Sequence, residues 1–380
     1  MMGKHPRPPA WQVSVFAVIP AVWIAWATAL ATSGDREWSV SDFLTFRAAA
    51  SDLLHGRSPY PIHADPSLLS AGRTFVYPPV AAYPFVPFTA LPAHVAIVVY
   101  LVVSLVAIAA ALWIIGVRDW RVLGVVLLWE PVLMWLFKGP IEPWMLLLLA
   151  VGWRWRAHVF RLAAIVALLV SLKLFLWPLL LWLLATRRIR AFLASAGLTA
   201  IFVLVPFASV GMHSLRVYPH LLQALTDVFG SSSFSLLAVF ESVTSSGTAQ
   251  VATIVLAFAL VGLIGLVAAR EDGDRRAFSA AIIGGVMLSP IVWAHYFVLL
   301  AVPIGLARPR LSGLWFVPLA FWATGAAALG EPHRLAIGAL VPLVVLAVTC
   351  WKPPTGQERR AGPLAQSTGN ASGSASPAMR

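Results

Sequence analysis

Apolar segments separated by short polar breaks run along almost the whole chain. A helix needs roughly 20 mainly apolar residues to cross a bilayer, so the shorter segments must pack inside a bundle or pair as broken helices. The pattern predicts an all-α polytopic membrane protein with about 10–13 transmembrane helices. The candidate spans lie near residues 11–32, 93–116, 120–137, 141–152, 160–171, 173–186, 190–208, 250–269, 277–290, 291–306, 311–328 and 335–351.

The composition agrees with this pattern. Charged residues make up 11% of the chain and hydrophobic residues 60%, whereas an average soluble domain has about 25% charged residues. We therefore expect one integral domain over residues 11–352, after a short N-terminus at 1–10. The tail at 353–380 is rich in Gly, Ser, Ala and Pro and is expected to be disordered. The single cysteine, Cys350, excludes an internal disulfide and a cysteine-based metal site.

Basic residues occur in short clusters on alternate breaks between the apolar segments. They form no single stripe, so the net charge of +12 does not indicate a nucleic-acid partner. The positive-inside rule assigns these clusters to the cytoplasm, which places 19 of the 27 basic residues and both termini there. We expect a bacterial plasma-membrane protein. The clusters are Lys4/Arg7, Arg118/Arg121, Arg154/Arg156/Arg161, Arg187/Arg188/Arg190, Arg270/Arg275/Arg276, Arg308/Arg310 and Lys352/Arg359/Arg360/Arg380.

Two long loops, at about 33–92 and 209–249, then face the outer side. The first contains an amphipathic helix at 41–54, which is expected to lie on the membrane surface. Its apolar face consists of Phe43, Phe46, Ala50, Leu53 and Leu54. The segment at 76–91 has two prolines near its start and is interpreted as a re-entrant or surface helix. A full span there would move the later basic clusters to the outer side of the membrane.

Several ionisable residues interrupt the apolar pattern on the outer side. Lys173 lies within a segment that is apolar on both sides, and an ionisable residue in that position predicts a functional role. Lys138 lies at an outward break, where it either binds substrate or reaches out to water, with Glu142 as a possible partner. Asp42 is either a first-turn acid that satisfies free backbone N–H groups or a reactive carboxylate. Asp35, Glu37 and Asp52 are interpreted as solvated surface charges.

The remaining polar residues leave similar alternatives. His295, just inside a helix after Pro290, is either hydrogen-bonded within the bundle or a ligand for a phosphate or hydroxyl. Arg216, with His213, Tyr218 and His220, either binds an anionic headgroup or belongs to a solvated loop. Glu130 lies in an apolar segment and has no assigned role. One carboxylate, one imidazole and two lysines on one membrane face suit chemistry on a phosphate-bearing lipid substrate.

At these residues the chain resembles bacterial glycosyltransferase family 87, the polyprenol-phosphate-mannose-dependent α-(1→2)-mannosyltransferases and relatives with the GT-C fold. The resemblance covers residues of about 11–350 and departs from the family at Gly139-Pro140, where many relatives have Gly-Asn. It rests on Asp42-Phe43…Phe46-Arg47-Ala48-Ala49…Leu54-His55-Gly56-Arg57-Ser58-Pro59-Tyr60, Phe75-Val76-Tyr77-Pro78-Pro79, Lys173-Leu174-Phe175-Leu176-Trp177-Pro178…Thr186-Arg187-Arg188 and Ser289-Pro290-Ile291-Val292-Trp293-Ala294-His295-Tyr296.

The resemblance implies a membrane enzyme that moves a hexose, with mannose expected, from a polyprenyl-phosphate donor to a glycolipid or polysaccharide acceptor on the outer face. Asp42 would be the general base of an inverting displacement, and Lys173, His295 and Lys138 would bind the donor phosphate. Acceptor or sugar contacts are expected from Arg47, Tyr60, Tyr77, Trp293, Tyr296 and Arg216. Neither a metal nor a nucleotide cofactor is expected. The expected partners are membrane lipids, the donor and the acceptor.

Two classes of protein compete with this interpretation. A lipid or solute transporter, or a flippase, would show internal symmetry and polar residues near the midplane of the membrane. Here the polar candidates lie at the outer boundary, which favours the enzyme. An envelope scaffold would not require Lys173. An arabinofuranosyltransferase-type relative that uses a different polyprenyl-phosphate sugar is a further alternative within the enzyme class.

Overall fold

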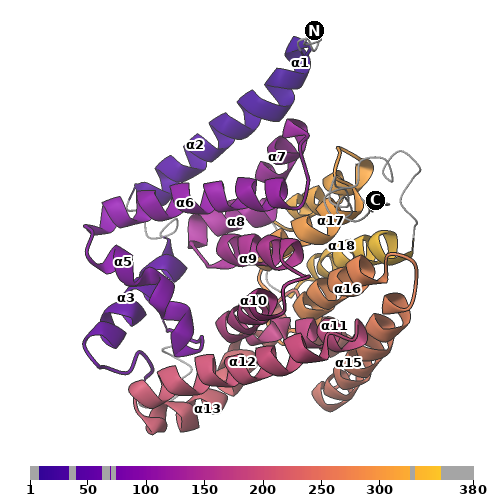
Figure 1. The fold of residues 1–380 in the computed structure, drawn as a ribbon. Coiled ribbons are helices and arrows are strands. Elements are labelled where there is room, and N and C mark those ends of the chain that lie inside the picture. The colour runs from indigo at the N-terminus through magenta and orange to yellow at the C-terminus, as the bar shows by residue number, and fades with distance from the viewer. Residues whose placement is uncertain (1–7, 34–39, 62–68, 70–73, 326–329, 352–380) are drawn as a thin grey trace, which may run out of the picture.

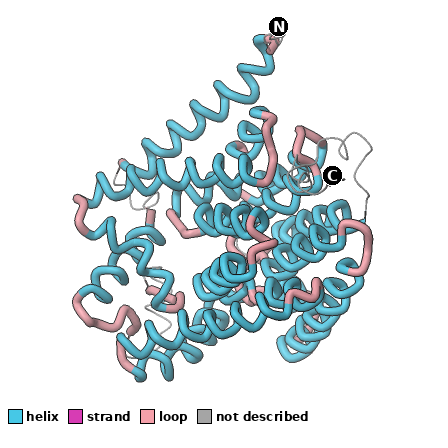
Figure 2. The backbone as a smooth tube through the Cα atoms, viewed as in Figure 1, coloured by secondary structure: helices cyan, strands magenta, loops and turns pink. Residues whose placement is uncertain are grey.

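The computed structural model describes residues 8–33, 40–61, 69, 74–325 and 330–351. Within these residues the chain forms helices, turns and loops and no strand (Figure 2). The expectations for Lys4, Arg7, Asp35, Glu37 and the tail at 353–380 fall outside the described residues.

The helices follow the apolar segments closely. The N-terminal rod consists of α1 (Ala10–Val13), η1 (Ser14–Val18) and α2 (Ile19–Thr32). The first loop contains α3 (Ser41–Leu54), η3 (Pro79–Phe85) and α5 (Val86–Thr89). Next come α6 (Ala93–Ile114), α7 (Trp120–Leu127), α8 (Glu130–Lys138), α9 (Glu142–Arg154), α10 (Val159–Leu172), η4 (Leu174–Leu176), α11 (Pro178–Ala185) and α12 (Ile189–Ser209). The rest are α13 (Met212–Phe229), η5 (Gly230–Ser232), α14 (Leu236–Glu241), α15 (Ser246–Ala268), α16 (Gly273–Leu288), η6 (Ala294–Leu300), α17 (Ala301–Ala307), η7 (Gly313–Thr324) and α18 (Pro332–Trp351).

Five of the described helices are long and apolar enough to cross a membrane: Ala10–Thr32, α6, α12, α15 and α18. A sixth is possible if α7 and α8, which meet at an angle of 62°, form one broken span. The all-α polytopic fold is thus confirmed. Fewer described helices than the expected 10–13 are long and apolar enough to count as spans. The remaining apolar helices are shorter: α10, the pair η4–α11, the pair η6–α17 and η7.

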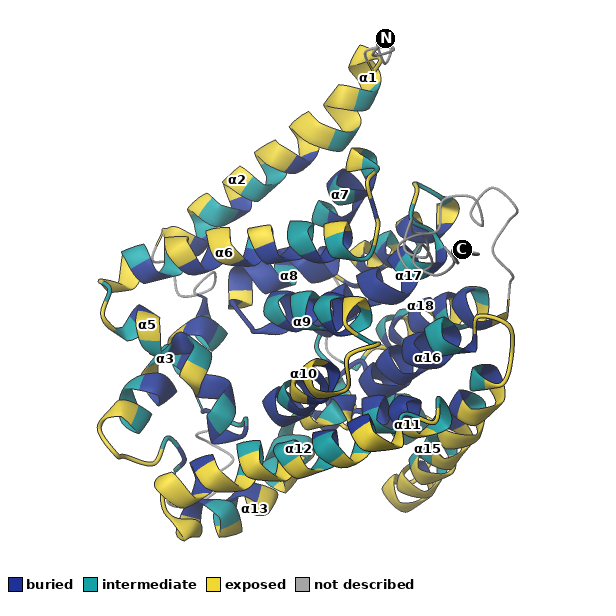
Figure 3. Ribbon diagram, in the orientation of Figure 1, coloured by how far each residue is buried: buried dark blue, intermediate teal, exposed yellow. Residues whose placement is uncertain are grey.

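The long helix α16 occupies the interior of the bundle, whereas α15 beside it is largely exposed (Figure 3). Of the 16 residues of α16, 13 are buried. Its small residues permit this close packing, since a Cβ at Gly284 would lie 2.4 Å from the Leu260 side chain and one at Gly285 would lie 2.6 Å from the Phe175 carbonyl oxygen. On α15, Phe258 is 74% exposed, as expected for a helix that faces lipid.

Several of the predicted cytoplasmic clusters contact one another at one end of the bundle. Asp274 binds Arg188, with Nη1 2.6 Å from Oδ1, and Arg156, with Nε 3.3 Å from Oδ2. Arg276 donates a hydrogen bond to the carbonyl oxygen of Cys350 at the end of α18. Loops that are far apart in the sequence therefore share a basic end, as the spacing of the clusters predicted.

At the opposite end, α3, α5 and α13 gather beside the ends of α6 and α12 (Figure 1). The expected helix at 41–54 is confirmed, but its apolar face packs on protein. Phe43 and Phe46 are fully buried, and Phe46 stacks on Phe85 with the ring centroids 4.5 Å apart. The expectation that this face lies on the membrane surface is therefore wrong for these residues; Leu54, by contrast, is 57% exposed. The segment at 76–91 forms η3 and α5, which are too short to cross a membrane.

Candidate active site

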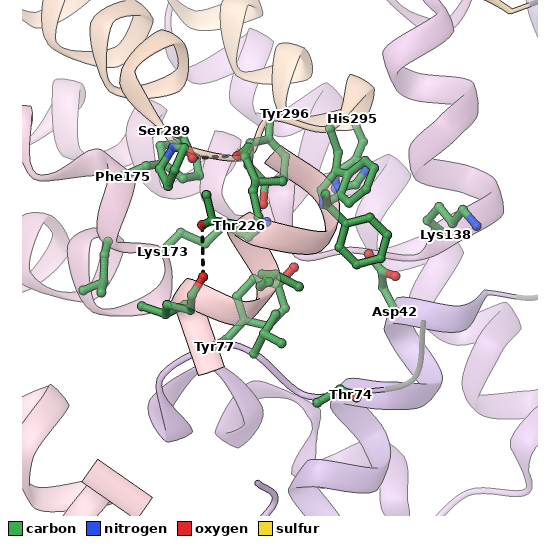
Figure 4. A pocket seen from close by; sticks show the side chains of 18 of the residues that line it. Asp42, Thr74, Tyr77, Lys138, Lys173, Phe175, Thr226, Ser289, His295 and Tyr296 are labelled. Atoms are coloured by element: carbon green, nitrogen blue, oxygen red, sulfur yellow. Dashed lines mark hydrogen bonds between the residues drawn. The ribbon is translucent and has the colours of Figure 1, made fainter. Parts of the chain in front are cut away.

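A cavity of about 670 Å³ opens between the first loop, α13 and the bundle (Figure 4). Its volume lies within the range of small-molecule sites, which is about 300–1,000 Å³. Of the residues expected at the site, Asp42, Tyr77, Lys138, Lys173, Trp293, His295 and Tyr296 line it. The structure thus brings together residues from five separate stretches of the sequence.

Asp42 lies in the first turn of α3, at the wall of the cavity. Among the described residues, the only hydrogen bond found to its carboxylate comes from a side chain and not from a backbone N–H group, which does not support the interpretation as a helix-capping acid. The Ser41 hydroxyl donates a long hydrogen bond of 3.4 Å to Oδ1. Burial raises the pKa of Asp42 from 3.8 to about 6, against the opposing effect of the nearby Lys173. Asp42 is therefore mostly ionised at neutral pH but can accept a proton readily.

Gly139 brings Lys138 to the same wall. Lys138 ends α8, and Gly139 follows in the left-handed conformation at a φ of 70°. A Cβ at Gly139 would lie 2.8 Å from the Cβ of Phe43, one residue from Asp42 in the sequence. Glycine therefore supplies both the backbone conformation and the close approach of α8 to α3. The Lys138 side chain is exposed and lies near Asp42, whose pKa it lowers.

Lys173 forms a buried ion pair with Glu142, a partner that we had suggested for Lys138. The backbone of Lys173 is extended and separates α10 from η4, and Glu142 is the first residue of α9. Their side chains are 2% and 0% exposed, and Nζ of Lys173 donates a hydrogen bond to Oε1 of Glu142. The ammonium lies 3.9 Å from the ring centroid of Tyr296 and 4.8 Å from that of Tyr77. A buried lysine requires a counterion, so the sequence could indicate that some acid neutralises Lys173, but not that this acid is Glu142.

His295 also faces Glu142, but without a hydrogen bond. Its Nε2 is 3.6 Å from Oε1 of Glu142. Among the described residues this buried nitrogen has no hydrogen-bond partner, and neither does Oε2 of Glu142. A buried polar atom without a partner is costly, and His295 lines the cavity. The imidazole can therefore bind a polar group of a ligand there.

The second long loop contributes more to the cavity than expected. The sequence suggests a solvated loop or an anion site around Arg216, but these residues form the helix α13. It lines the cavity with Tyr218, Leu222, Leu225, Thr226 and Phe229. The available signal was apolar residues at helical spacing. In Figure 4 the Thr226 hydroxyl bonds back to the main chain of the same helix.

Arg334 is a lining residue that we did not predict. It lies in the first turn of α18, and its guanidinium carbon is 4.5 Å from the centroid of the Phe234 ring. Glu130, which had no assigned role, is 5% exposed and interacts electrostatically with Arg334. The signal for Arg334 was a basic residue at the expected outer end of an apolar segment, which departs from the positive-inside rule.

Three of the expected contact residues lie outside the cavity. Arg47 donates hydrogen bonds to the carbonyl oxygens of Phe88 and Leu91, and so links α3 to the segment after it. Tyr60 donates a hydrogen bond of 2.6 Å to the carbonyl oxygen of Tyr77 and thereby positions a lining residue. Arg216 is exposed on α13.

The arrangement provides one accessible carboxylate, cationic groups, and apolar walls formed by residues such as Phe175 and Phe229. Among the described residues, no group of three or more His, Cys, Asp or Glu side chains could hold a metal ion. The site can take a proton from a hydroxyl and bind an anionic group whose remainder is apolar.

One comparison with known proteins gave a match. Neither the curated proteins nor the solved structures gave a match to this chain. The profile of glycosyltransferase family 87 matches residues 75–294, which include Lys138, Glu142 and Lys173. His295 directly follows the matched range, whereas Asp42 lies well before its start at residue 75. Because more than half of the chain matches, this multi-pass membrane protein belongs to glycosyltransferase family 87.

Proposed function

We propose that this glycosyltransferase moves a hexose, with mannose as the expected sugar, from a polyprenyl-phosphate donor to a hydroxyl of a glycolipid or polysaccharide acceptor. The observation that carries the proposal is the position of Asp42. It is a carboxylate with a pKa of about 6 on the wall of a cavity that also presents Lys138, Lys173 and His295. A general base works best when its pKa lies near the working pH.

The proposed reaction is a single displacement with inversion at the anomeric carbon. The acceptor oxygen forms the new bond to this carbon while its proton passes to Asp42. The bond from the carbon to the phosphate oxygen breaks, and polyprenyl phosphate leaves with the electron pair. Charge grows on the phosphate during this step, so cations placed around it lower the barrier.

Donor phosphate binding is assigned to Lys138, Lys173 and His295. Lys138 is exposed and has no ion-pair partner among the described residues, so its charge is available to an anion. Lys173 is neutralised by Glu142, yet an ammonium group has three N–H donors and the ion pair uses one. His295 adds the unpartnered Nε2. Tyr77, Tyr296 and Trp293 offer aromatic faces to the sugar or the acceptor.

The apolar part of the cavity suits the lipid half of the donor. Leu222, Leu225 and Phe229 of α13 line it, together with Phe175 and Trp177. A volume of about 670 Å³ holds a sugar phosphate and the first isoprene units. The rest of the polyprenyl chain would then continue into the bilayer.

We place the cavity on the outer face of the plasma membrane, with both termini in the cytoplasm. The basic loops that meet around Asp274 lie at the end of the bundle away from α3 and α13, which supports this orientation under the positive-inside rule. No metal or nucleotide takes part in the proposed reaction.

Purified protein in lipid nanodiscs tests the choice of donor. The assay supplies an acceptor mannolipid and either a radiolabelled polyprenyl-phosphate sugar or the corresponding nucleotide sugar. We expect transfer from the lipid-linked donor alone, with the opposite anomeric configuration in the product. Transfer from the nucleotide sugar, or retention of configuration, would contradict the proposal.

A further inference from the structure

A second cavity lies at the basic end of the bundle. It has a volume of about 460 Å³ and is lined by four arginines, Arg156, Arg187, Arg188 and Arg190. We call it the arginine cleft. It is formed where α10 and α12, which pack side by side, both begin. The proposed glycosyl transfer assigns no role to it.

The arginine cleft carries excess positive charge. Arg156 and Arg188 share one carboxylate, that of Asp274. Arg187 and Arg190 are exposed, and their guanidinium groups have no hydrogen-bond or ion-pair partner among the described residues. Four arginines thus line the cleft, and Asp274 contacts two of them. Such a surface attracts an anion with several acceptor oxygens, and the arginine fork suits phosphate.

Backbone groups add to this attraction. Neither α10 nor α12 has a side-chain cap at its N-terminus, so free N–H groups and the positive ends of two helices lie at the cleft. Arg187 has a φ of 59°, a left-handed conformation in which glycine is usual after a helix. An arginine in this conformation is strained.

The neighbouring surface indicates the source of the phosphate. Phe160 on α10 is 82% exposed, and Ile189 and Leu193 on α12 are 47% and 62% exposed. α12 is long and apolar enough to cross a membrane, so its first residues lie where lipid headgroups meet the hydrocarbon. Large apolar side chains beside a basic cleft fit a molecule with a phosphate head and acyl chains.

We propose that the arginine cleft binds the phosphate of an anionic lipid headgroup. Arg187 and Arg190 contact the phosphate oxygens, and Arg156 and Arg188, positioned by Asp274, form the base of the cleft. The acyl chains lie along Phe160 and Leu193. This site is separate from the proposed transfer site and does not depend on the identity of the donor.

Native mass spectrometry of the full-length protein tests this proposal by counting retained lipids. The protein is titrated with phosphatidylglycerol, phosphatidylcholine or inorganic phosphate. We expect the wild type to retain phosphatidylglycerol in preference to phosphatidylcholine. The double variant Arg187→Gln/Arg190→Gln should retain it about 30-fold more weakly, which is about 2 kcal/mol for the two arginines.

The matched control is Arg270→Gln/Arg310→Gln, which removes two exposed arginines of the same basic end that do not line the cleft. It should retain the lipid as the wild type does. An equal loss in both double variants, or no preference for the anionic lipid, would overturn the proposal. Displacement of the lipid by equimolar inorganic phosphate would assign the cleft to a soluble anion instead. If the double variant does not fold, Arg190→Gln alone provides the same comparison, with a loss of about fivefold expected.

Discussion

At the scale of single residues, the ionisation of Asp42 links the structure to a measurable pH profile. Its pKa is raised to about 6 by burial, and the proposed base works only when it is ionised. We expect the rate of transfer to increase about tenfold per pH unit below pH 6 and to level off above it. Initial rates at saturating donor between about pH 4.5 and pH 8 measure this. A rate that is flat through pH 6, or that falls as the pH rises, would exclude Asp42 as the base.

The Glu142–Lys173 ion pair permits a second test. Removing one partner leaves a buried charge without a counterion, so Lys173→Met and Glu142→Gln should each lower the free energy of unfolding by about 3–5 kcal/mol. The double variant removes both charges and should recover most of this loss. Thermal unfolding of the four proteins in one detergent measures it. Additive losses in the double variant would show that the two side chains do not form a pair.

The same residues show what the sequence could and could not reveal about the site. Asp42, Lys138, Lys173 and His295 could be singled out because each interrupts an apolar pattern or begins a helix. The acid that neutralises Lys173 could not be identified in this way, because Glu142 is 31 positions away and the pairing depends on how α9 and α10 pack. Arg47 and Tyr60 likewise have main-chain partners that only the fold brings within reach.

At the scale of elements, the contact of α8 with α3 depends on Gly139. Gly139→Ala places a Cβ 2.8 Å from that of Phe43 and also strains a φ of 70°, so α3 and Asp42 must move. We expect the rate of transfer to fall by about 100-fold, as for a catalytic group displaced by about 1 Å. Gly116→Ala is the control, because Gly116 has a φ of 95° but nothing within 4 Å of its Cβ position. Equal rates for the two variants would show that the contact with Phe43 has no role.

Element boundaries were well predicted where the apolar pattern was strong. The expected helix at 41–54 begins and ends as the structure has it, and the expected spans near 190–208 and 250–269 correspond to α12 and α15. α13 was not predicted, because its polar face resembles a loop in composition and its apolar face becomes informative only beside the cavity. The surface placement of α3 failed for a similar reason: an amphipathic pattern shows that a face is buried, not what buries it.

At the scale of the whole molecule, the structure places the basic loops and the cavity at opposite ends. With Cys350 replaced by serine, cysteine can be introduced at Leu54, near the cavity end, and at Arg310, in a basic loop; both positions are exposed. We expect a membrane-impermeant maleimide to label Leu54→Cys in intact spheroplasts and Arg310→Cys only after permeabilisation. The reverse pattern would place the active site in the cytoplasm.

Ionisation of Asp42 also affects the stability of the whole fold. Because its pKa is higher in the folded state than its ordinary value of 3.8, the folded state holds the proton more tightly. The contribution of Asp42 to stability therefore falls as the pH rises through the window from 3.8 to about 6, by about 3 kcal/mol in total. Asp42→Asn removes this cost, so at pH 7 the variant should unfold at the same temperature as the wild type or a higher one.

The most direct test of the account is therefore the rate of sugar transfer by Asp42→Asn at pH 7, measured beside Asp52→Asn. Asp52 lies on the same helix and pairs with Arg57 away from the cavity. We expect Asp42→Asn to remain folded and to lose about 10²–10⁴-fold in rate, the usual contribution of a general base, while Asp52→Asn transfers sugar as the wild type does. Transfer at the wild-type rate by folded Asp42→Asn would contradict the account.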